Sequence, residues 1–219
     1  MAASPLERAV EVMDRLRSPG GCPWDAAQTH ESLTRYLLEE AYEVIEAIET
    51  GDLALLREEL GDLLLQVLFH ARMTQELPPE QAFGIDDVAA DLVDKLVRRH
   101  PHVFAGIEAG TADELNETWE RQKVDEKGRT SAVDGVPLNQ PALALAAKLV
   151  SRARRAGLAG PPTDGDGIGA RLMALVAEAV AAGVDPEAAL RRTAREYRSA
   201  LVSEENRDAG PTSRRAVEE

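Results

Sequence analysis

The 219-residue chain contains little cysteine, few aromatic residues and no long apolar run. Its one cysteine, Cys22, excludes an internal disulfide. No apolar stretch approaches the roughly 20 residues that span a bilayer, and the first twenty residues have an amphipathic pattern without a signal-peptide core. Basic residues number 25 against 39 acidic ones, and the net charge of −14 disfavours nucleic-acid polymers and anionic membranes as partners. We therefore expect a cytoplasmic protein with neither partner.

Strand-like alternation is absent as well, and helical periodicity dominates the sequence. Pro101 ends the fourth predicted helix, because the residue before a proline resists the α conformation. A capping box, Thr111-x-x-Glu114, opens the fifth. The sequence predicts an all-α fold, with helices at residues 5–17, 28–49, 53–75, 86–99, 111–123, 142–156, 168–182 and 186–202.

Basic side chains are missing between Tyr36 and Asp52, where six acidic residues occur. Like charges three or four residues apart on a helix repel by roughly 0.2–0.5 kcal/mol per pair, so an ordinary surface helix would include lysine. At 100° per residue, Glu40 and Glu43 lie at the edge of the apolar face, at the boundary between core and water. A solvated face would explain this helix alone. A hard divalent cation with oxygen ligands would offset the repulsion.

The second half of this predicted hairpin is apolar on nearly every side, which is typical of a helix surrounded by protein. Asp62 is embedded among its leucines, where an ionised carboxylate is costly unless it is paired or bound to a metal. Glu59 lies one turn earlier, so both carboxylates can reach one point. A turn at residues 50–52 would bring them to Glu40 and Glu43, so the spacing predicts a metal site.

The acidic motifs and their flanking segments resemble one protein family. The similar segments are Glu39-Glu40-x-x-Glu43, then fifteen residues, then Glu59-x-x-Asp62, together with residues 21–30 and 98–104 and the pattern Trp119-Glu120-x-x-Lys123. In this order they resemble the MazG-type nucleoside triphosphate pyrophosphohydrolases of the all-α NTP pyrophosphatase superfamily, from about Leu6 to Lys127. The resemblance implies a helical bundle whose four-helix core is completed in a homodimer. It also implies Mg²⁺-dependent cleavage of a nucleoside triphosphate to the monophosphate and pyrophosphate, in nucleotide-pool housecleaning.

The charge of such a substrate requires a cation. A triphosphate would be repelled by acidic side chains unless divalent ions bridge carboxylates and phosphate oxygens. We expect Mg²⁺, with Mn²⁺ as a substitute, and a metal-activated water that attacks the α phosphate. The predicted metal ligands are Glu40, Glu43, Glu59 and Asp62. Glu39 either completes a second metal site or takes the proton from the water, and all five are predicted to be catalytic.

Three segments offer contacts to the nucleotide. Lys95, Arg98 and Arg99 share one helix, and the planar fork of arginine suits phosphate oxygens. Trp119 and Lys123 share a helix face, where an indole and an ammonium could meet a base and a phosphate. Exposed helical cations and a core tryptophan are the alternatives. Trp24 either stacks on a base or pins the loop at Pro23, and the four histidines receive no role.

Turn-forming residues divide the sequence into two halves. We expect a MazG-type domain at 1–127, a linker at 128–141, a reduced second repeat at 142–205 and a disordered tail at 206–219. Residues 60–67 align with 168–175, but Asp62 aligns with Ala170, and the first acidic helix has no counterpart. One active site per chain follows, although chance similarity would also explain so short and alanine-rich an alignment.

Two other classes remain open. A Nudix-like pyrophosphohydrolase would share the segment at residues 57–61, but the upstream Arg-Glu pair and the strands of that class are missing. A non-catalytic acidic interaction protein would explain the charge but not Asp62 among leucines. A third class, the di-iron carboxylate bundle, is disfavoured further. It needs two Glu-x-x-His motifs, but Val67 stands three residues before His70.

Overall fold

The computed structural model describes residues 3–106, 110–111, 114–115, 118–119, 130–161, 165 and 167–208. These residues form helices, turns and loops, with no strand among them, so the all-α prediction is confirmed. Two compact units make up the chain, Met1–Leu115 and Asn116–Glu219. Their boundary falls inside the helix predicted at 111–123, much of which lies outside the described residues.

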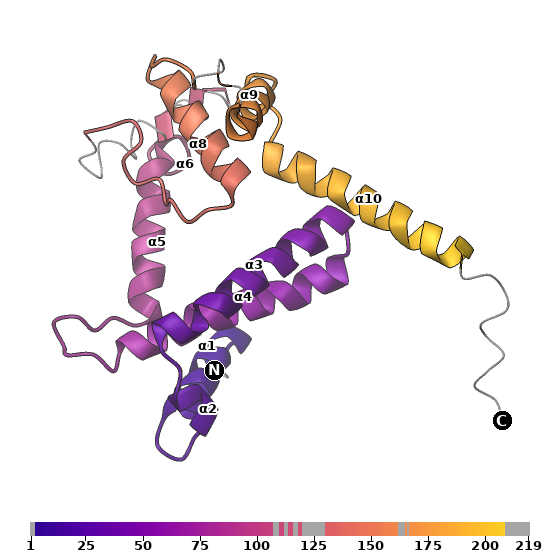
Figure 1. Cartoon of the computed structure of the whole chain (residues 1–219). Helices are drawn as coiled ribbons and strands as arrows, with labels where there is room; N and C mark the ends of the chain where they lie inside the picture. The colour runs from indigo at the N-terminus through magenta and orange to yellow at the C-terminus, as the bar shows by residue number, and fades with distance from the viewer. Residues whose placement is uncertain are drawn as a thin grey trace, which may run out of the picture. The chain divides into compact units, whose positions relative to one another are not determined.

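Six helices of the first unit lie wholly within the described residues. They are α1 Pro5–Arg17, α2 Pro23–Ala26, α3 His30–Thr50, α4 Leu53–Thr74, α5 Ile85–Arg99 and α6 Pro101–Phe104 (Figure 1). The single-turn helices α2 and α6 were not predicted, because each begins at a proline that reads as a break in the sequence. Of the described helices, none is both long enough and apolar enough to cross a membrane.

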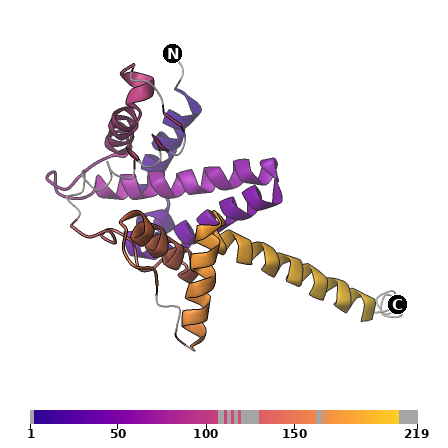
Figure 2. The same cartoon turned by 90° about the horizontal axis from the view of Figure 1, so that it is seen from above.

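A tight turn joins α3 to α4. Gly51 ends α3 with φ of 73°, a left-handed conformation that glycine adopts without strain. Asp52 then caps α4, since its Oδ1 accepts hydrogen bonds from the amides of Ala54 and Leu55 at 3.0 Å each. The two helices run antiparallel and side by side in Figure 1 and Figure 2. Residues 40–43 of α3 therefore face residues 59–62 of α4.

The buried core of the first unit lies between α1, α3 and α4, toward the open end of the hairpin. Its members are Met13, Leu33, Leu68, Phe69 and Met73. Arg17, at the end of α1, closes this region: its side chain is 4% exposed, contacts Glu76 at 2.9 Å and lies over the Phe69 ring. The core thus holds α1 against the hairpin. The acidic segments lie nearer the turn, and their carboxylates are not part of this core.

Helix α4 is less enclosed than its sequence predicts. Leu60, Leu64 and Val67 follow one another at helical spacing and are 49%, 38% and 41% exposed. The expectation that protein surrounds this helix is therefore wrong for the single chain. Packing by α1, α3 and α5 covers only part of its circumference, and the remaining apolar stripe is open.

The second unit contains α8 Ala142–Arg155, α9 Ile168–Ala181 and α10 Pro186–Asp208. Val136, Val150 and Val176 are buried in it. Arg152 fastens the preceding loop to α8, because its Nη1 donates hydrogen bonds to the carbonyls of Ala132 and Asp134 at 3.2 and 2.7 Å. Helix α10 continues three residues into the stretch predicted as a tail, and residues 209–219 lie outside the described chain.

Candidate metal centre

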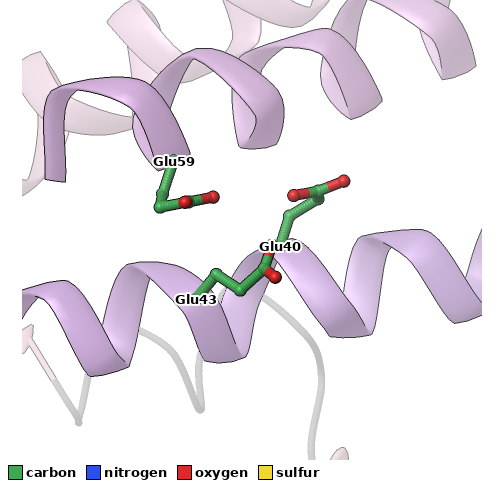
Figure 3. A group of neighbouring side chains, drawn as sticks. All are labelled: Glu40, Glu43 and Glu59. Carbon is green, nitrogen blue, oxygen red and sulfur yellow. The ribbon is translucent and has the colours of Figure 1, made fainter. Parts of the chain in front are cut away.

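Three carboxylates converge between the two long helices. Glu40 and Glu43 project from α3 and Glu59 from α4, and each offers one oxygen within 4.8 Å of the others (Figure 3). The Gly51 turn produces this arrangement by setting the two acidic segments opposite each other. The antiparallel hairpin therefore creates the cluster from residues that are up to nineteen positions apart.

Burial and mutual repulsion change the proton affinity of this cluster. Glu59 is buried and Glu40 is half-buried, whereas Glu43 is exposed. The pKa of Glu40 is raised to about 7, first by burial, then by its hydrogen bond to Glu43 and by the charges of Asp62, Glu43 and Glu59. Burial also raises the pKa of Glu59, helped by the charges of Glu43 and Asp62. Near neutral pH the cluster alone therefore tends to retain a proton.

The donor set suits a hard divalent cation. All three ligand groups are carboxylates, and none forms an ion pair with a described lysine or arginine. Oxygen ligands of this kind are the ones that Mg²⁺, Mn²⁺ and Ca²⁺ prefer. A bound cation would favour the ionised form of each carboxylate and so reverse the pKa increase of Glu40.

Two further predicted ligands do not belong to this cluster. Asp62 is half-buried on α4 and is not one of the three converging groups, yet its charge raises the pKa of both Glu40 and Glu59. Glu39 is exposed on α3 and also stands outside the group. Three of the five predicted residues thus meet directly, and Asp62 acts on them through its charge.

The predicted substrate contacts are more dispersed. Lys95, Arg98 and Arg99 lie in the C-terminal half of α5, the first two exposed and the third half-buried. Helix α5 packs against α4 at the start of α5 and then leads away from the hairpin (Figure 1). The single chain does not bring these described cations to the carboxylates. Trp119 is half-buried in the second unit, and Lys123 lies outside the described residues.

Polar residues of α4 continue beyond the carboxylates. Gln66, one turn after Asp62, is 4% exposed, and its Oε1 is buried without a hydrogen-bond partner. One turn further, His70 Nδ1 lies 2.7 Å from His30 Nδ1, and the two rings stack at 5.0 Å between centroids. Burial and the neighbouring His30 lower the pKa of His70. The sequence analysis missed this polar stripe, which the four-residue spacing of Asp62, Gln66 and His70 could have indicated.

The second unit has no comparable centre in its described part. The three carboxylates of α3 and α4 are the sole group of three or more potential metal ligands among the described residues. Ala170, which the sequence aligns with Asp62, lies in the first turn of α9.

Comparisons with known proteins place this hairpin in a family. Residues 28–104, which include α3, α4 and α5, match the MazG nucleotide pyrophosphohydrolase domain. A Thermotoga maritima protein named nucleoside triphosphate pyrophosphohydrolase/pyrophosphatase MazG is 38% identical over 88% of this chain and 82% of its own length. This chain belongs to the MazG family.

Other MazG relatives differ in length. An uncharacterized 26.1 kDa protein of Streptomyces cacaoi is 56% identical over 90% of this chain and 81% of its own length. The Mycobacterium tuberculosis nucleoside triphosphate pyrophosphohydrolase is 52% identical over 70% of this chain but only 46% of its own length. The chain therefore aligns with about half of that longer MazG protein.

Proposed function

We propose that the α3–α4 hairpin cleaves nucleoside triphosphates between the α and β phosphates, releasing the monophosphate and pyrophosphate. The convergence of Glu40, Glu43 and Glu59 carries this proposal. Membership of the MazG family supports it, as do relatives named nucleoside triphosphate pyrophosphohydrolase. The acidic helical alternative explains charge but gives no reason for three carboxylates to meet without a basic partner.

Glu40, Glu43 and Glu59 would hold Mg²⁺, or Mn²⁺ in its place. Such an ion, when bound, neutralises phosphate oxygens and makes water more acidic. The protein contributes a fixed set of acceptors, because two packed helices hold the carboxylates and burial restricts Glu59 in particular. The phosphates would approach from the side of Glu43, because it is the exposed member of the group.

The attacking water must lose a proton as its oxygen bonds to the α phosphorus and the bond to the β phosphate breaks. Glu39 is exposed next to this cluster in sequence and would either take that proton or complete a second metal site. Asp62 would stabilise the bound cation with its charge, as its effect on Glu40 and Glu59 supports. Both residues are thus assigned to the reaction without belonging to the converging group.

The phosphates also need cationic partners from the protein. We assign this role to Lys95, Arg98 and Arg99, with Trp119 and Lys123 as further substrate contacts. A homodimer would supply the α5 cations from a second copy, since α5 leads away from its own hairpin. The open stripe of Leu60, Leu64 and Val67 on α4 supports association as well. A chain with Leu64→Glu should sediment as a smaller species than the unmodified chain.

The remaining assignments concern the whole protein. We propose nucleotide-pool housecleaning in the cytoplasm, a single active site in the first unit and a packing or association role for the helices of the second. The absence of a carboxylate cluster from the described part of the second unit supports the single site. A panel of normal, oxidised and deoxy nucleotides tests housecleaning, because equal rates throughout would count against selection of damaged ones.

A direct assay tests the reaction. Purified protein incubated with mixed nucleoside triphosphates and Mg²⁺ should release pyrophosphate. Orthophosphate as the first product would indicate cleavage at another bond. No release of either product, under conditions where the protein is folded by circular dichroism, would favour the non-catalytic interaction protein.

A further inference from the structure

Two histidines from different helices meet at the open end of the hairpin. His30 is the first residue of α3, and His70 lies one turn before the end of α4. Their Nδ1 atoms are 2.7 Å apart, and their ring planes differ by 7°. A contact this short needs one proton between the two nitrogens, so one ring donates an Nδ1–H and the other accepts it. The first turn of α3 is thus tied to α4 by a bond that depends on protonation.

The pair has no favourable place for a further proton. The Nε2 atom of His70 is buried and has no hydrogen-bond partner among the described residues, whereas His30 is exposed. When either ring becomes an imidazolium, His70 must carry a hydrogen on this buried Nε2, or both Nδ1 atoms carry hydrogens and their contact breaks. A buried N–H without an acceptor is costly. Burial and the neighbouring His30 accordingly lower the pKa of His70.

The carboxylates nearest to His70 already have partners. Arg17 of α1 binds Glu76 at 2.9 Å. Arg72, two residues after His70 on α4, binds Glu76 at 3.1 Å and Asp14 at 2.7 Å. These ion pairs hold the two carboxylates on the arginines, and neither accepts a hydrogen bond from the buried Nε2. An imidazolium at His70 would therefore remain without a counter-ion in the closed arrangement.

The charge beside His30 acts in the opposite direction. Hydrogen bonds to the Glu31 backbone amide and to Thr29 hold the pKa of Glu31 below its ordinary value of 4.5. Glu31 therefore stays ionised in mild acid and attracts a charged His30 once the Nδ1 contact is broken. The other acidic groups of the adjoining helices are Asp25 of α2 and Asp86 and Asp87 in the first turn of α5.

The first turn of α3 adjoins the segment that carries Trp24, a predicted substrate contact. Trp24 lies in α2 and is 52% exposed, and its indole makes an edge-to-face contact with the Tyr36 ring at 6.1 Å between centroids. Arg17 supports the same segment, since its Nη1 donates hydrogen bonds to the carbonyls of Asp25 and Gln28. An arginine keeps its charge across the pH range of proteins. The histidine pair thus adds a titratable contact to a support that does not titrate.

We propose that His30 and His70 form an acid-sensitive switch, which holds the first turn of α3 on α4 near neutral pH and releases this turn together with α2 in mild acid. The released state is favoured in acid because water can then solvate an imidazolium at either position. The opening is local, since the rest of α3 keeps its packing on α4 toward the Gly51 turn. This inference does not depend on the proposed reaction, and its test uses no nucleotide.

Amide hydrogen exchange, measured by mass spectrometry in a chelating buffer, tests the switch. Rates are corrected for the intrinsic effect of pH, and peptides covering residues 24–34 are compared with peptides covering residues 40–48. Between pH 7.5 and pH 5 the unmodified chain should lose about tenfold more protection at 24–34 than at 40–48, because an unpaired buried N–H shifts a local opening equilibrium by about that factor.

His70→Gln removes the switch but keeps a hydrogen-bonding side chain. Glutamine offers both a donor and an acceptor, so it can bond to His30 in either protonation state, and the extra loss at residues 24–34 should disappear. The matched control is His102→Gln, which removes a histidine of α6 outside the pair and should behave like the unmodified chain. Glu40 titrates in the same pH range but is present in all three chains, so it does not distinguish them.

Imidazole nitrogen spectra of the unmodified chain decide the question even if His70→Gln does not fold. His70 should stay neutral to a lower pH than the histidines of the urea-unfolded chain. Titration of both His30 and His70 at the pH of the unfolded chain would overturn the switch. So would equal losses of protection in the two segments of the unmodified chain, or an undiminished extra loss at residues 24–34 in folded His70→Gln.

Discussion

Glu40 on α3 and Glu59 on α4 place carboxylate oxygens within 4.8 Å of each other across the hairpin. Two negative charges so close, with burial raising the pKa of both groups, are stabilised by a proton or by a cation. The pairing also explains why this acidic surface differs from an ordinary solvated helix face. Its consequences for activity, stability and metal binding can be measured separately.

Removing one charge at the centre should reduce turnover strongly. Glu40→Gln and Glu59→Gln keep the side-chain shape but remove a ligand charge, so each should lower kcat/KM by about a hundredfold or more. The matched control is Glu46→Gln, which removes the same charge from an exposed position of α3 outside the carboxylate group. Pyrophosphate release at saturating Mg²⁺ is the readout. Near-normal rates for both centre variants would contradict the assignment.

Stability should depend on pH in the direction opposite to that of a paired carboxylate. The folded pKa of Glu40, about 7, lies above its ordinary value of 4.5, so the folded chain binds more protons between these values and Glu40 disfavours folding increasingly as pH rises. The lowered pKa of His70 has the opposite effect below 6.5, because burial favours its neutral form. The contribution of Glu40 is therefore measured as the difference in stability between the Glu40→Gln chain and the unmodified chain, because His70 is the same in both.

In a chelating buffer, the melting temperature of Glu40→Gln minus that of the unmodified chain should increase from pH 5 to pH 7.5. Mg²⁺ should raise the melting temperature of the unmodified chain more at pH 7.5 than at pH 5, because the cation competes with the proton on Glu40. A difference between the two chains that stays constant with pH would show that Glu40 titrates normally.

Arg17 should be a major determinant of stability. Arg17→Met removes a buried guanidinium that binds two loop carbonyls and Glu76, and loss of a buried charged partner costs about 3 kcal/mol. Urea unfolding measures this loss. Glu76→Gln should cost less, about 1 kcal/mol, since the Glu76 side chain is 42% exposed. Glu76 also pairs with Arg72 at 3.1 Å. Equal effects of the two substitutions would therefore show that the ion pairs of Glu76, and not the carbonyl contacts of Arg17, are responsible.

Replacing Gln66, unlike replacing Arg17, should make the folded chain more stable. Its Oε1 is buried without a hydrogen bond, so Gln66→Met, which is similar in shape but apolar, should increase the free energy of unfolding by about 1 kcal/mol. Thermal and urea unfolding in chelating buffer measure the change. A loss of stability would mean that the amide oxygen has a partner in solution.

The sequence predicted much of the hairpin because its signals are local. Gly51 and Asp52 specify the turn and the cap, and apolar periodicity specifies the two helices, which the structure confirms within two residues at each end. The encounter of Glu59 with Glu40 and Glu43 follows from that turn. Asp62 could not be separated from Glu59 in the same way, because spacing along one helix does not determine which side chain points between two helices.

Contacts between distant segments were beyond sequence patterns. Nothing local indicates that Arg17 reaches Glu76, or that His30 stacks on His70, because both contacts depend on how α1 and α3 pack on α4. The exposure of Leu64 was also unpredictable, since a helix that is apolar all round looks the same whether its partner is its own chain or another copy. The edge-to-face contact of Trp24 with Tyr36 likewise depends on how α2 lies against α3.

Binding of Mn²⁺, followed by electron paramagnetic resonance of the free ion, tests the metal centre without depending on turnover or on the choice of nucleotide. The unmodified chain and Glu46→Gln should both remove Mn²⁺ from solution, and Glu59→Gln should bind it at least tenfold more weakly. Mg²⁺ should compete for the same site. Equal Mn²⁺ binding by all three chains, or none by the unmodified chain with and without nucleotide, would contradict the proposal that these helices hold a divalent cation.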